Sequence, residues 1–336
     1  MSARSDLLAE PVGGQPWRRR LVGFLGEQGF IVIFLLWALY LTFNTDNFAT
    51  TNNLFTILRQ ATIVGIAAIG AHFVILMGDL DLSVAAIISL SGVVMGELMV
   101  HHGMSAILAG LAALGLGASI GLVNGLIITK LRINAIIATL GTSSILTGFA
   151  FTITKGKTIF GPRGNDPIDA IEFLSRQRVL GDHVPVPVII LFISYVVAFV
   201  VLRRTAYGAR VFAVGNNDRA AWLSGINVDL VKIATFMLSG ALGGFAGIMQ
   251  VARQGTATAG MGADFLFPIL TAVVLGGASL KGGRGKVFNT LIAAIFLTSI
   301  TNGMILLNIG IYTQNIVSGV ILVVALSLDR LRTLRL

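Results

Sequence analysis

The chain has 336 residues, of which 55% are hydrophobic and 12% are charged, and its mean hydropathy is +0.88. A soluble domain carries roughly 25% charged residues, so this composition predicts an integral membrane protein. The 40 glycines fit that class, because small residues let membrane helices pack closely. The lack of cysteine excludes disulfides, thiolate metal sites and cysteine nucleophiles.

The net charge of +9 is interpreted as a signal of membrane topology and not of nucleic-acid binding. Basic residues of membrane proteins concentrate in cytoplasmic loops, where they set the orientation of the spans. Arg18, Arg19 and Arg20 precede the first apolar run, as in a signal peptide. Because polar residues 44–47 follow that run in place of a small-residue cleavage site, we expect an uncleaved first span.

The apolar pattern predicts an all-α polytopic membrane protein. A helix needs about 20 mostly apolar residues to cross a bilayer, and several segments here are short or interrupted by glycine. The ten expected spans cover 26–43, 60–78, 83–101, 105–129, 134–154, 186–202, 230–252, 265–280, 287–306 and 309–328.

The distribution of Lys and Arg predicts that both termini are cytoplasmic. With the N-terminus inside, the cytoplasmic segments hold most of the 24 basic residues. These segments are 1–25, 130–133, 203–232, 281–286 and 329–336. We therefore expect a basic N-terminal segment, 1–25, before one transmembrane domain, 26–336. The domain would carry a cytoplasmic loop over 203–232 and an outer loop over 155–185.

Two points of topology stay open at this stage. Spans 2–5 and 7–10 comprise four segments each, and an offset of five spans would make them inverted repeats, as in many transporters. Residues 79–83 fall at the inner face by the span count, but they could equally be a helix break within the membrane.

The polar, basic segment 203–232 lies between two long apolar segments. Asn216, Asn217 and Asp218 are typical residues for the start of a short helix, and Gly225 is typical of its end. A short capped helix between two spans predicts a part that another protein holds. Alternatively, Trp222 in this segment is an aromatic residue at the headgroup level of the membrane.

Few ionisable residues lie inside the predicted spans; the main ones are His72 and Glu97, and Glu97 is expected at the outer interface. An ion-driven carrier needs a buried relay of acids or histidines, which the sequence does not show. Uncharged polar residues are more frequent and could hydrogen-bond a neutral polyol. Each could also bridge helices, which is the structural alternative. The candidates for a translocation pathway are His72, Asn124, Thr139 and Asn302.

The sequence lacks a nucleotide site and a catalytic constellation, so we expect a transport subunit without a cofactor and not an enzyme. Gly156-Lys157-Thr158 has the end of a phosphate-binding loop, but Phe151 occupies the position that requires the first glycine.

In the outer loop, residues 168–174 predict a short amphipathic helix, either on the membrane surface or facing a soluble partner.

Three segments resemble the permease subunits of bacterial ABC importers for ribose, xylose, arabinose, galactose and autoinducer-2. Residues Asp79, Asp81, Leu82 and Ser83 resemble the family signature Gly-Ile-Asp-Leu-Ser-Val-Gly, although Asp79 and Ala85 replace its two glycines. Residues 121–125 with 136–142 are similar to the central core of that family. Residues 208–228 resemble its cytoplasmic coupling loop, and the likeness covers about residues 45–328.

The resemblance implies a subunit of a larger assembly in the bacterial inner membrane. Its partners would be a cytoplasmic ATP-binding subunit, an extracytoplasmic sugar-binding protein, a second permease subunit and the lipid bilayer. A permease for branched-chain amino acids is a related alternative, and an ion-driven carrier is an alternative from another class. The coupling helix that would dock on the ATPase comprises Gly215, Asn216, Asn217, Asp218, Arg219, Ala220, Ala221, Trp222, Leu223, Gly225 and Ile226.

Overall fold

The computed structural model describes residues 16–160, 169–179, 181 and 184–334, and in this part the chain is almost entirely α-helical. Residues 1–15 of the predicted basic segment and 161–168 of the predicted outer loop lie outside the described residues. The helices are α1 (Pro16–Asn44), α2 (Thr51–Leu76), α3 (Val84–Val100), α4 (Ala106–Lys130), α5 (Ala135–Thr154), α6 (Asp169–Arg176), α7 (Val186–Arg204), α8 (Ala206–Asn216), α9 (Asp218–Leu223), α10 (Val228–Gln254), η1 (Ala263–Phe265), α11 (Leu266–Leu275), α12 (Val287–Leu306) and α13 (Ile311–Leu334).

Each of the ten predicted apolar segments contains a helix, and the all-α membrane class is confirmed. Six helices of the described chain are long and apolar enough to cross a membrane, namely α2, α4, α5, α7, α10 and α12. Four shorter apolar helices cover Phe30–Asn44, Val84–Val100, Ala263–Leu275 and Ile311–Val324. The count of ten crossings, the inverted repeat and the cytoplasmic location of both termini stay predictions.

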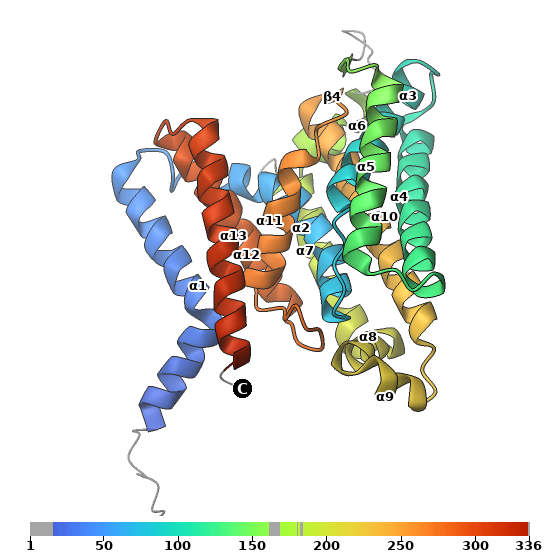
Figure 1. Cartoon of the computed structure of the whole chain (residues 1–336). Coiled ribbons are helices and arrows are strands. Elements are labelled where there is room, and N and C mark those ends of the chain that lie inside the picture. The colour runs from blue at the N-terminus through green and yellow to red at the C-terminus, as the bar shows by residue number, and fades with distance from the viewer. Residues whose placement is uncertain (1–15, 161–168, 180, 182–183, 335–336) are drawn as a thin grey trace, which may run out of the picture.

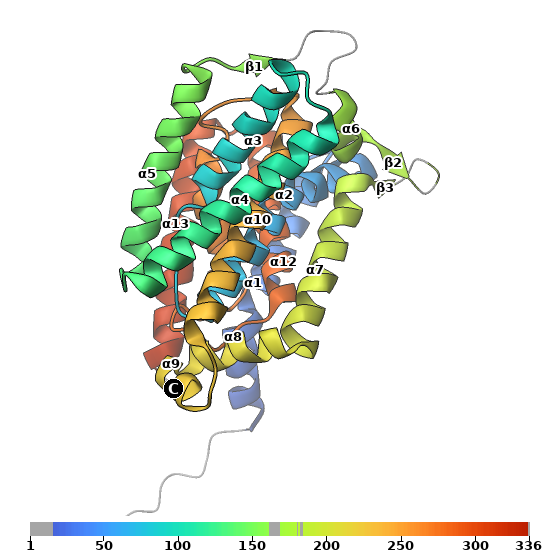
Figure 2. The ribbon, with the colours of Figure 1, turned by 90° about the vertical axis from the view of Figure 1, so that its right-hand side faces the viewer.

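The long helices run between two ends of the molecule, which differ in structure (Figures 1 and 2). We call the end with α8 and α9 the α9 end. The opposite end, the β1 end, holds α6 and strand β1 (Ile159–Phe160), which pairs antiparallel with β4 (Thr256–Ala257). A small hairpin of β2 (Arg178–Val179) and β3 (Val184–Pro185) leads into α7.

Helices α4 and α10 meet along a glycine seam. A methyl group on Gly117 would overlap the carbonyl oxygen of Gly240, and one on Gly121 would overlap the carbonyl oxygen of Phe236. The two backbones therefore approach each other directly, as small residues allow in membrane helices. The close packing of helices that the glycine content predicts is observed between α4 and α10.

Helix α2 forms the centre of the molecule. Its side chains are buried without interruption from Ala61 to Met77, against α7, α10 and α12. Helices α4, α5 and α7 instead present large apolar side chains outward, among them Leu122, Ile145 and Val196. A helix that is apolar and exposed in this way suits lipid as its surroundings.

The stretch between α2 and α3 is a helix break. Helix α2 ends at Leu76, and α3 begins at Val84 and has 17 residues. Asp81 and Ser83 are buried between helices, while Asp79 lies at the α9 end against Lys232. Non-helical backbone inside a membrane protein needs protein partners, and the N–H of Leu82 donates to Thr139 Oγ1 at 3.1 Å.

Several predicted boundaries were wrong by five residues or more. Helices α1 and α2 begin at Pro16 and Thr51, before the starts predicted at 26 and 60. The segment predicted over 265–280 is helical only to Leu275, and Gly276 follows it as the C-cap. Gly277 then adopts a positive φ of 87°, which ends the helix because glycine takes this conformation without steric cost. Residues 276–286 form a glycine-rich loop that returns the chain to α12.

Candidate functional site

Residues 203–232, predicted to hold one short capped helix, form two helices. Thr205 caps α8 by accepting a hydrogen bond from the N–H of Gly208 at 3.2 Å. Asn217 caps α9 by accepting one from the N–H of Ala220 at 2.9 Å. Such caps satisfy N–H groups that lack a partner in the first turn. The predicted coupling residues Gly215 and Asn216 therefore belong to the end of α8.

Glycine and a buried alanine fix the far end of α9. Gly225 has a φ of +83°, and the N–H of Ile226 donates to the carbonyl oxygen of Ala221 at 3.1 Å. This is a left-handed helix end of the kind that glycine favours. Ala221 is buried and Ile226 is half-buried against a hydrophobic cluster that includes Val211 and Val231. The base of α9 is thus packed into the protein.

The outward side of α9 carries two large apolar side chains. Trp222 is 65% exposed and Leu223 is 72% exposed. Asp218, Arg219 and Ala220 are exposed beside them. Exposed aromatic and aliphatic groups on a short polar helix form a surface suited to a protein partner.

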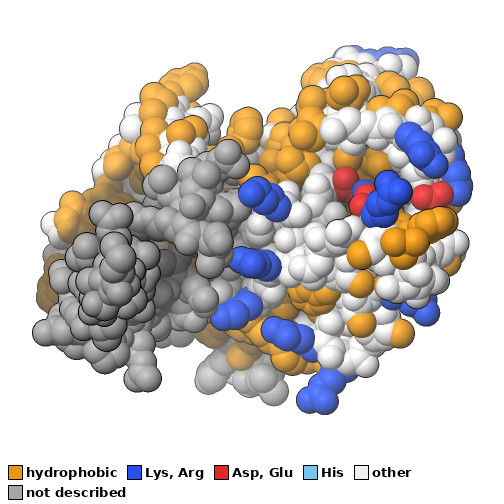
Figure 3. Space-filling view, turned by 60° about the horizontal axis from the view of Figure 1, so that its bottom comes forward, with side chains coloured by type: hydrophobic (Ala, Val, Ile, Leu, Met, Phe, Trp, Pro, Cys, Tyr) orange, Lys and Arg blue, Asp and Glu red, His pale blue; other side chains and the backbone are white. Residues whose placement is uncertain are grey.

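Basic side chains surround this surface at the α9 end (Figure 3). They come from the end of α7, from α8 and α9 and from the loop 276–286. The exposed ones in these segments are Arg203, Arg204, Arg210, Arg219, Lys281, Arg284 and Lys286. An excess of Lys and Arg at one end is typical of the cytoplasmic side of a membrane protein.

Glycines join α8 directly to the end of α2, in a contact that we call the glycine joint (Leu76, Gly78, Gly215, Gly282 and Gly283). The N–H of Gly283 donates to the carbonyl oxygen of Leu76 at 2.8 Å. A methyl group on Gly215 would overlap that same oxygen, and a Cβ on Gly282 would come within 2.6 Å of the Gly215 oxygen. The backbones of three segments therefore touch here, with no side chains between them.

An ion pair adds a second connection beside the joint. Lys232 Nζ lies 2.8 Å from Asp79 Oδ2, and the two side chains are only 19% and 16% exposed. The pair links the first turns of α10 to the segment after α2. Asp79, which replaces a glycine of the family signature, thus has a partner on another helix.

Buried polar groups around Asp81 hold the helix break in place. Asp81 accepts hydrogen bonds from Ser83 Oγ at 2.6 Å, from the Ser83 N–H at 3.0 Å and from Ser239 Oγ at 2.8 Å. Asn124 Nδ2 donates to Ser83 Oγ at 2.9 Å, and Thr142 Oγ1 donates to Asn124 Oδ1 at 2.7 Å. This network connects the signature segment with α4, α5 and α10.

The four predicted pathway residues do not converge on one place. Asn124 and Thr139 belong to the contacts around the helix break. His72 is fully buried, and its Nδ1 lies 2.9 Å from Thr290 Oγ1. Asn302 exchanges two side-chain hydrogen bonds with Asn53, at 3.0 and 2.9 Å. In these positions each residue bridges two segments, as the structural alternative stated.

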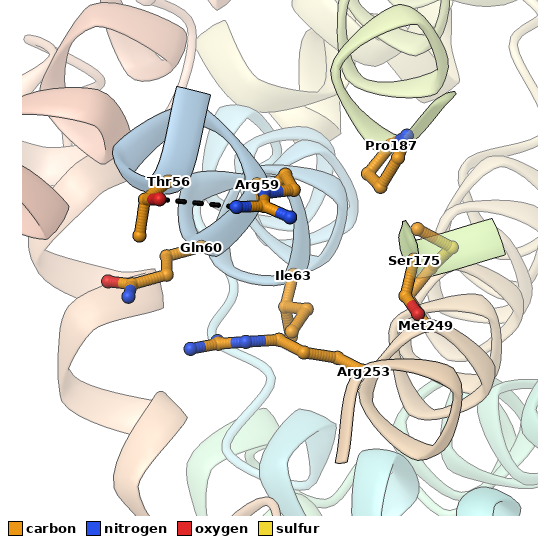
Figure 4. Close-up of a pocket in the computed structure, with 8 residues that line it drawn as sticks. All are labelled: Thr56, Arg59, Gln60, Ile63, Ser175, Pro187, Met249 and Arg253. Atoms are coloured by element: carbon orange, nitrogen blue, oxygen red, sulfur yellow. Dashed lines mark hydrogen bonds between the residues drawn. The ribbon is translucent and has the colours of Figure 1, made fainter. Parts of the chain in front are cut away.

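A cavity of about 220 Å³ lies toward the β1 end, where none of the four predicted pathway residues reaches (Figure 4). Four helices contribute to its wall. The lining residues are Thr56, Arg59, Gln60, Ile63, Ser175, Pro187, Met249 and Arg253. Sequence reasoning missed this group because its members are far apart in the chain. The available signal was the two arginines near span ends, away from the expected cytoplasmic segments.

Together these features describe a helical membrane protein with a short, exposed helix at one end and a polar cavity toward the other. A family model described as "Branched-chain amino acid transport system / permease component" matches residues 53–326. The ribose import permease protein RbsC of Escherichia coli K12 is 38% identical over 306 residues, which cover 91% of this chain and 94% of that protein. No solved structure matches the chain significantly.

Two further relatives extend this comparison. The D-allose transport system permease protein AlsC of Escherichia coli K12 is 30% identical over 90% of both chains. The L-arabinose ABC transporter permease protein AraH of Azospirillum brasilense is 32% identical over 92% of this chain and 88% of that protein. The chain belongs to this family of ABC-importer permeases, and it is a protein of the bacterial inner membrane.

Proposed function

We propose that the chain is the membrane-spanning permease subunit of an ATP-driven importer for a monosaccharide or a related polyol. Solute would arrive from an extracytoplasmic binding protein, and ATP hydrolysis would take place on a separate cytoplasmic subunit. A second permease subunit would complete the passage. The observation that carries the proposal is α9, a short helix with an exposed apolar surface and a base packed into the protein beside α8, which contacts the central helix α2.

The geometry around α9 supports a role in coupling. A partner that grips Trp222 and Leu223 and moves α9 also moves α8, because Ala221 and Ile226 pack the segment into the protein. The glycine joint passes that displacement to the end of α2 through backbone contacts. Backbone contacts deform little, so a shift at α9 becomes a shift of the helices around it.

The names of the relatives support a sugar as the solute. The ribose, D-allose and L-arabinose permeases each match about nine-tenths of this chain. The description of the family model names branched-chain amino acids, which keeps that class as the alternative. Of the two, the sugar class is supported by individual relatives that match along the chain.

The test removes the apolar surface of α9. We expect Trp222→Ala combined with Leu223→Ala to lower uptake and solute-stimulated ATP hydrolysis by about tenfold or more. Loss of one or two anchor residues typically costs about 2 kcal/mol or more of binding energy. The measurements are copurification of the ATPase with the permease and hydrolysis in proteoliposomes. Ile145→Ala, at an exposed apolar position of α5, is the control.

Two further variants alter α9 without removing its apolar groups. Arg219→Glu reverses an exposed charge, and Gly225→Pro is incompatible with a φ of +83°. Both should uncouple transport while the permease still inserts and purifies. Normal stimulated hydrolysis in both variants and in the double alanine variant would refute the assignment of α9 as the coupling helix.

A further inference from the structure

The cavity toward the β1 end has a distinctive set of walls. Arg59 and Gln60 come from α2, and Arg253 comes from the last turn of α10 (Figure 4). Ser175 of α6 and Pro187 of α7 close the other side. The cavity thus lies where four helices meet, and ligand sites are common between packed helices.

Two guanidinium groups dominate the polar chemistry of this cavity. Arg59 is half-buried and donates to Thr56 Oγ1 at 3.2 Å, while Arg253 is exposed at the edge. Among the described residues neither arginine forms an ion pair. An arginine has five N–H donors and no acceptor, so the cavity offers many donors and two positive charges without a carboxylate.

The rest of the wall suits a small molecule with both polar and apolar surface. Ile63, Met249 and Pro187 are buried and apolar, while Gln60 can donate and accept. The volume of about 220 Å³ is below the range of roughly 300–1,000 Å³ that is typical for drug-sized ligands. A molecule of monosaccharide size matches it better.

We propose that this cavity binds a monosaccharide that carries an anionic group, either a carboxylate or a phosphate, with Arg59 and Arg253 on the anion. Guanidinium groups bind such oxygens with paired, charge-assisted hydrogen bonds. A neutral sugar would use the same donors less well, because its hydroxyl hydrogens also need acceptors. The inference rests on the proposed transport of monosaccharides and narrows their chemical class.

An acidic side chain of a docked protein is the competing occupant. The floor of the cavity favours the small molecule, because the buried side chains of Ile63, Met249 and Pro187 line it beside the two arginines. A docked protein would contact the exposed arginine first and would bury little else in the cavity. The experiment below separates the two cases.

The direct test is titration calorimetry on the full permease in lipid nanodiscs. The probes are D-galacturonate and ribose 5-phosphate, compared with D-galactose and ribose. We expect at least one anionic probe to bind about tenfold or more tighter than its neutral counterpart. Arg59→Gln and Arg253→Gln should each remove most of that difference, whereas Arg59→Lys should keep part of it. Arg204→Gln, which removes an equal exposed charge at the far end of α7, should leave that difference unchanged.

The results that overturn the proposal are distinct. Equal affinity for charged and neutral probes, or anion binding that survives both glutamine substitutions, would refute it. Neutral-sugar uptake that is unchanged in Arg59→Gln, with no anion binding, would refute this inference and leave the proposed function intact. If no monosaccharide is taken up by the assembled importer, the proposed function fails, and the binding data still judge the cavity.

One more outcome assigns the arginines to a protein partner. Both glutamine variants would then lower the stimulation of ATP hydrolysis by the binding protein with neutral solutes as well, and added binding protein would restore it. That result would overturn the small-molecule proposal. Size-exclusion profiles of the variants, compared with the unchanged permease, exclude a general folding defect as the cause.

Discussion

The two ends of this permease differ in whether their basic side chains have protein partners and in how closely their backbones pack. At the α9 end, Lys232 lies 2.8 Å from Asp79, and glycines bring three backbones into contact. Toward the β1 end, Arg59 and Arg253 flank a cavity and form no ion pair with a described residue. The first arrangement fixes helices to one another, and the second leaves donors free to meet a ligand.

This difference indicates which polar groups serve structure and which are available for binding. The groups around the helix break and the glycine joint have protein partners at hydrogen-bond distance. Removing one of them should destabilise the fold. Removing a cavity arginine should change binding and leave stability nearly unaltered. The one side-chain hydrogen bond that would be lost, from Arg59 to Thr56 Oγ1, leaves Thr56 still bonded to the carbonyl oxygen of Asn52.

The largest loss of stability is expected for Asp81→Ala. The carboxylate accepts three hydrogen bonds inside the protein, and the variant would leave three buried donors without an acceptor. Each unsatisfied donor costs about 1–3 kcal/mol, so we expect a total of about 4 kcal/mol in a detergent unfolding assay. Ser91→Ala is the matched control, because the buried Ser91 Oγ has no partner among the described residues. A loss in Asp81→Ala no larger than in the control would contradict the structural role of Asp81.

The next largest effect is expected for Gly215→Val. The new side chain would collide with the carbonyl oxygen of Leu76 and open the glycine joint. Overpacking of this kind lowers the free energy of unfolding by about 1–3 kcal/mol. We expect the protein to remain folded but to lose most of its uptake, because the contact between α8 and α2 is lost. Thermal unfolding and uptake in proteoliposomes measure the two effects. Gly148→Val is the control, since nothing lies within 4 Å of a Cβ at that glycine. Unchanged uptake in Gly215→Val would rule out the joint as the route of coupling.

The smallest effects are expected at two ion pairs that have nearly the same N–O distance but differ in exposure. Lys232 and Asp79 are 2.8 Å apart and mostly buried, whereas Lys130 and Asp229 are 2.7 Å apart and 58% and 46% exposed. Double-mutant cycles with Lys→Met and Asp→Asn should give a coupling energy of about 1–2 kcal/mol for the first pair. The second should give about 0.5 kcal/mol or less, because water screens it. Equal coupling energies would show that burial does not strengthen the pair of Lys232 and Asp79.

Much of the fold could be predicted from the apolar pattern. Predicted spans such as 83–101, 105–129 and 287–306 agree with α3, α4 and α12 to within about a residue, because polar or charged residues bound these apolar runs. Helix α8 was not predicted as a separate element. It has only 11 residues and modest apolarity, and its position depends on contacts with α2 that are distant in sequence.

The candidate site could be predicted only in part. Asn217 and Gly225 signal α9 through local chemistry, so the helix was visible in the sequence. Asn124 and Thr139 looked like passage residues, because the sequence does not tell whether a polar side chain faces a space or a neighbouring helix. The cavity with Arg59 and Arg253 was not predicted, since only the packing of α2 against α10 brings the two arginines together.

One helix belongs to both regions compared above. Helix α2 has 26 residues, so it is about 39 Å long, and its first turns carry Arg59 while its last carbonyl lies in the glycine joint. A solute that favours one position of α2 and an ATPase subunit that favours another position must weaken each other's binding. By thermodynamic reciprocity, a solute that lowers the affinity of the ATPase subunit tenfold is itself bound tenfold more weakly when that subunit is bound. Release of the solute would then need no separate gating element, because α2 would make the two affinities depend on each other.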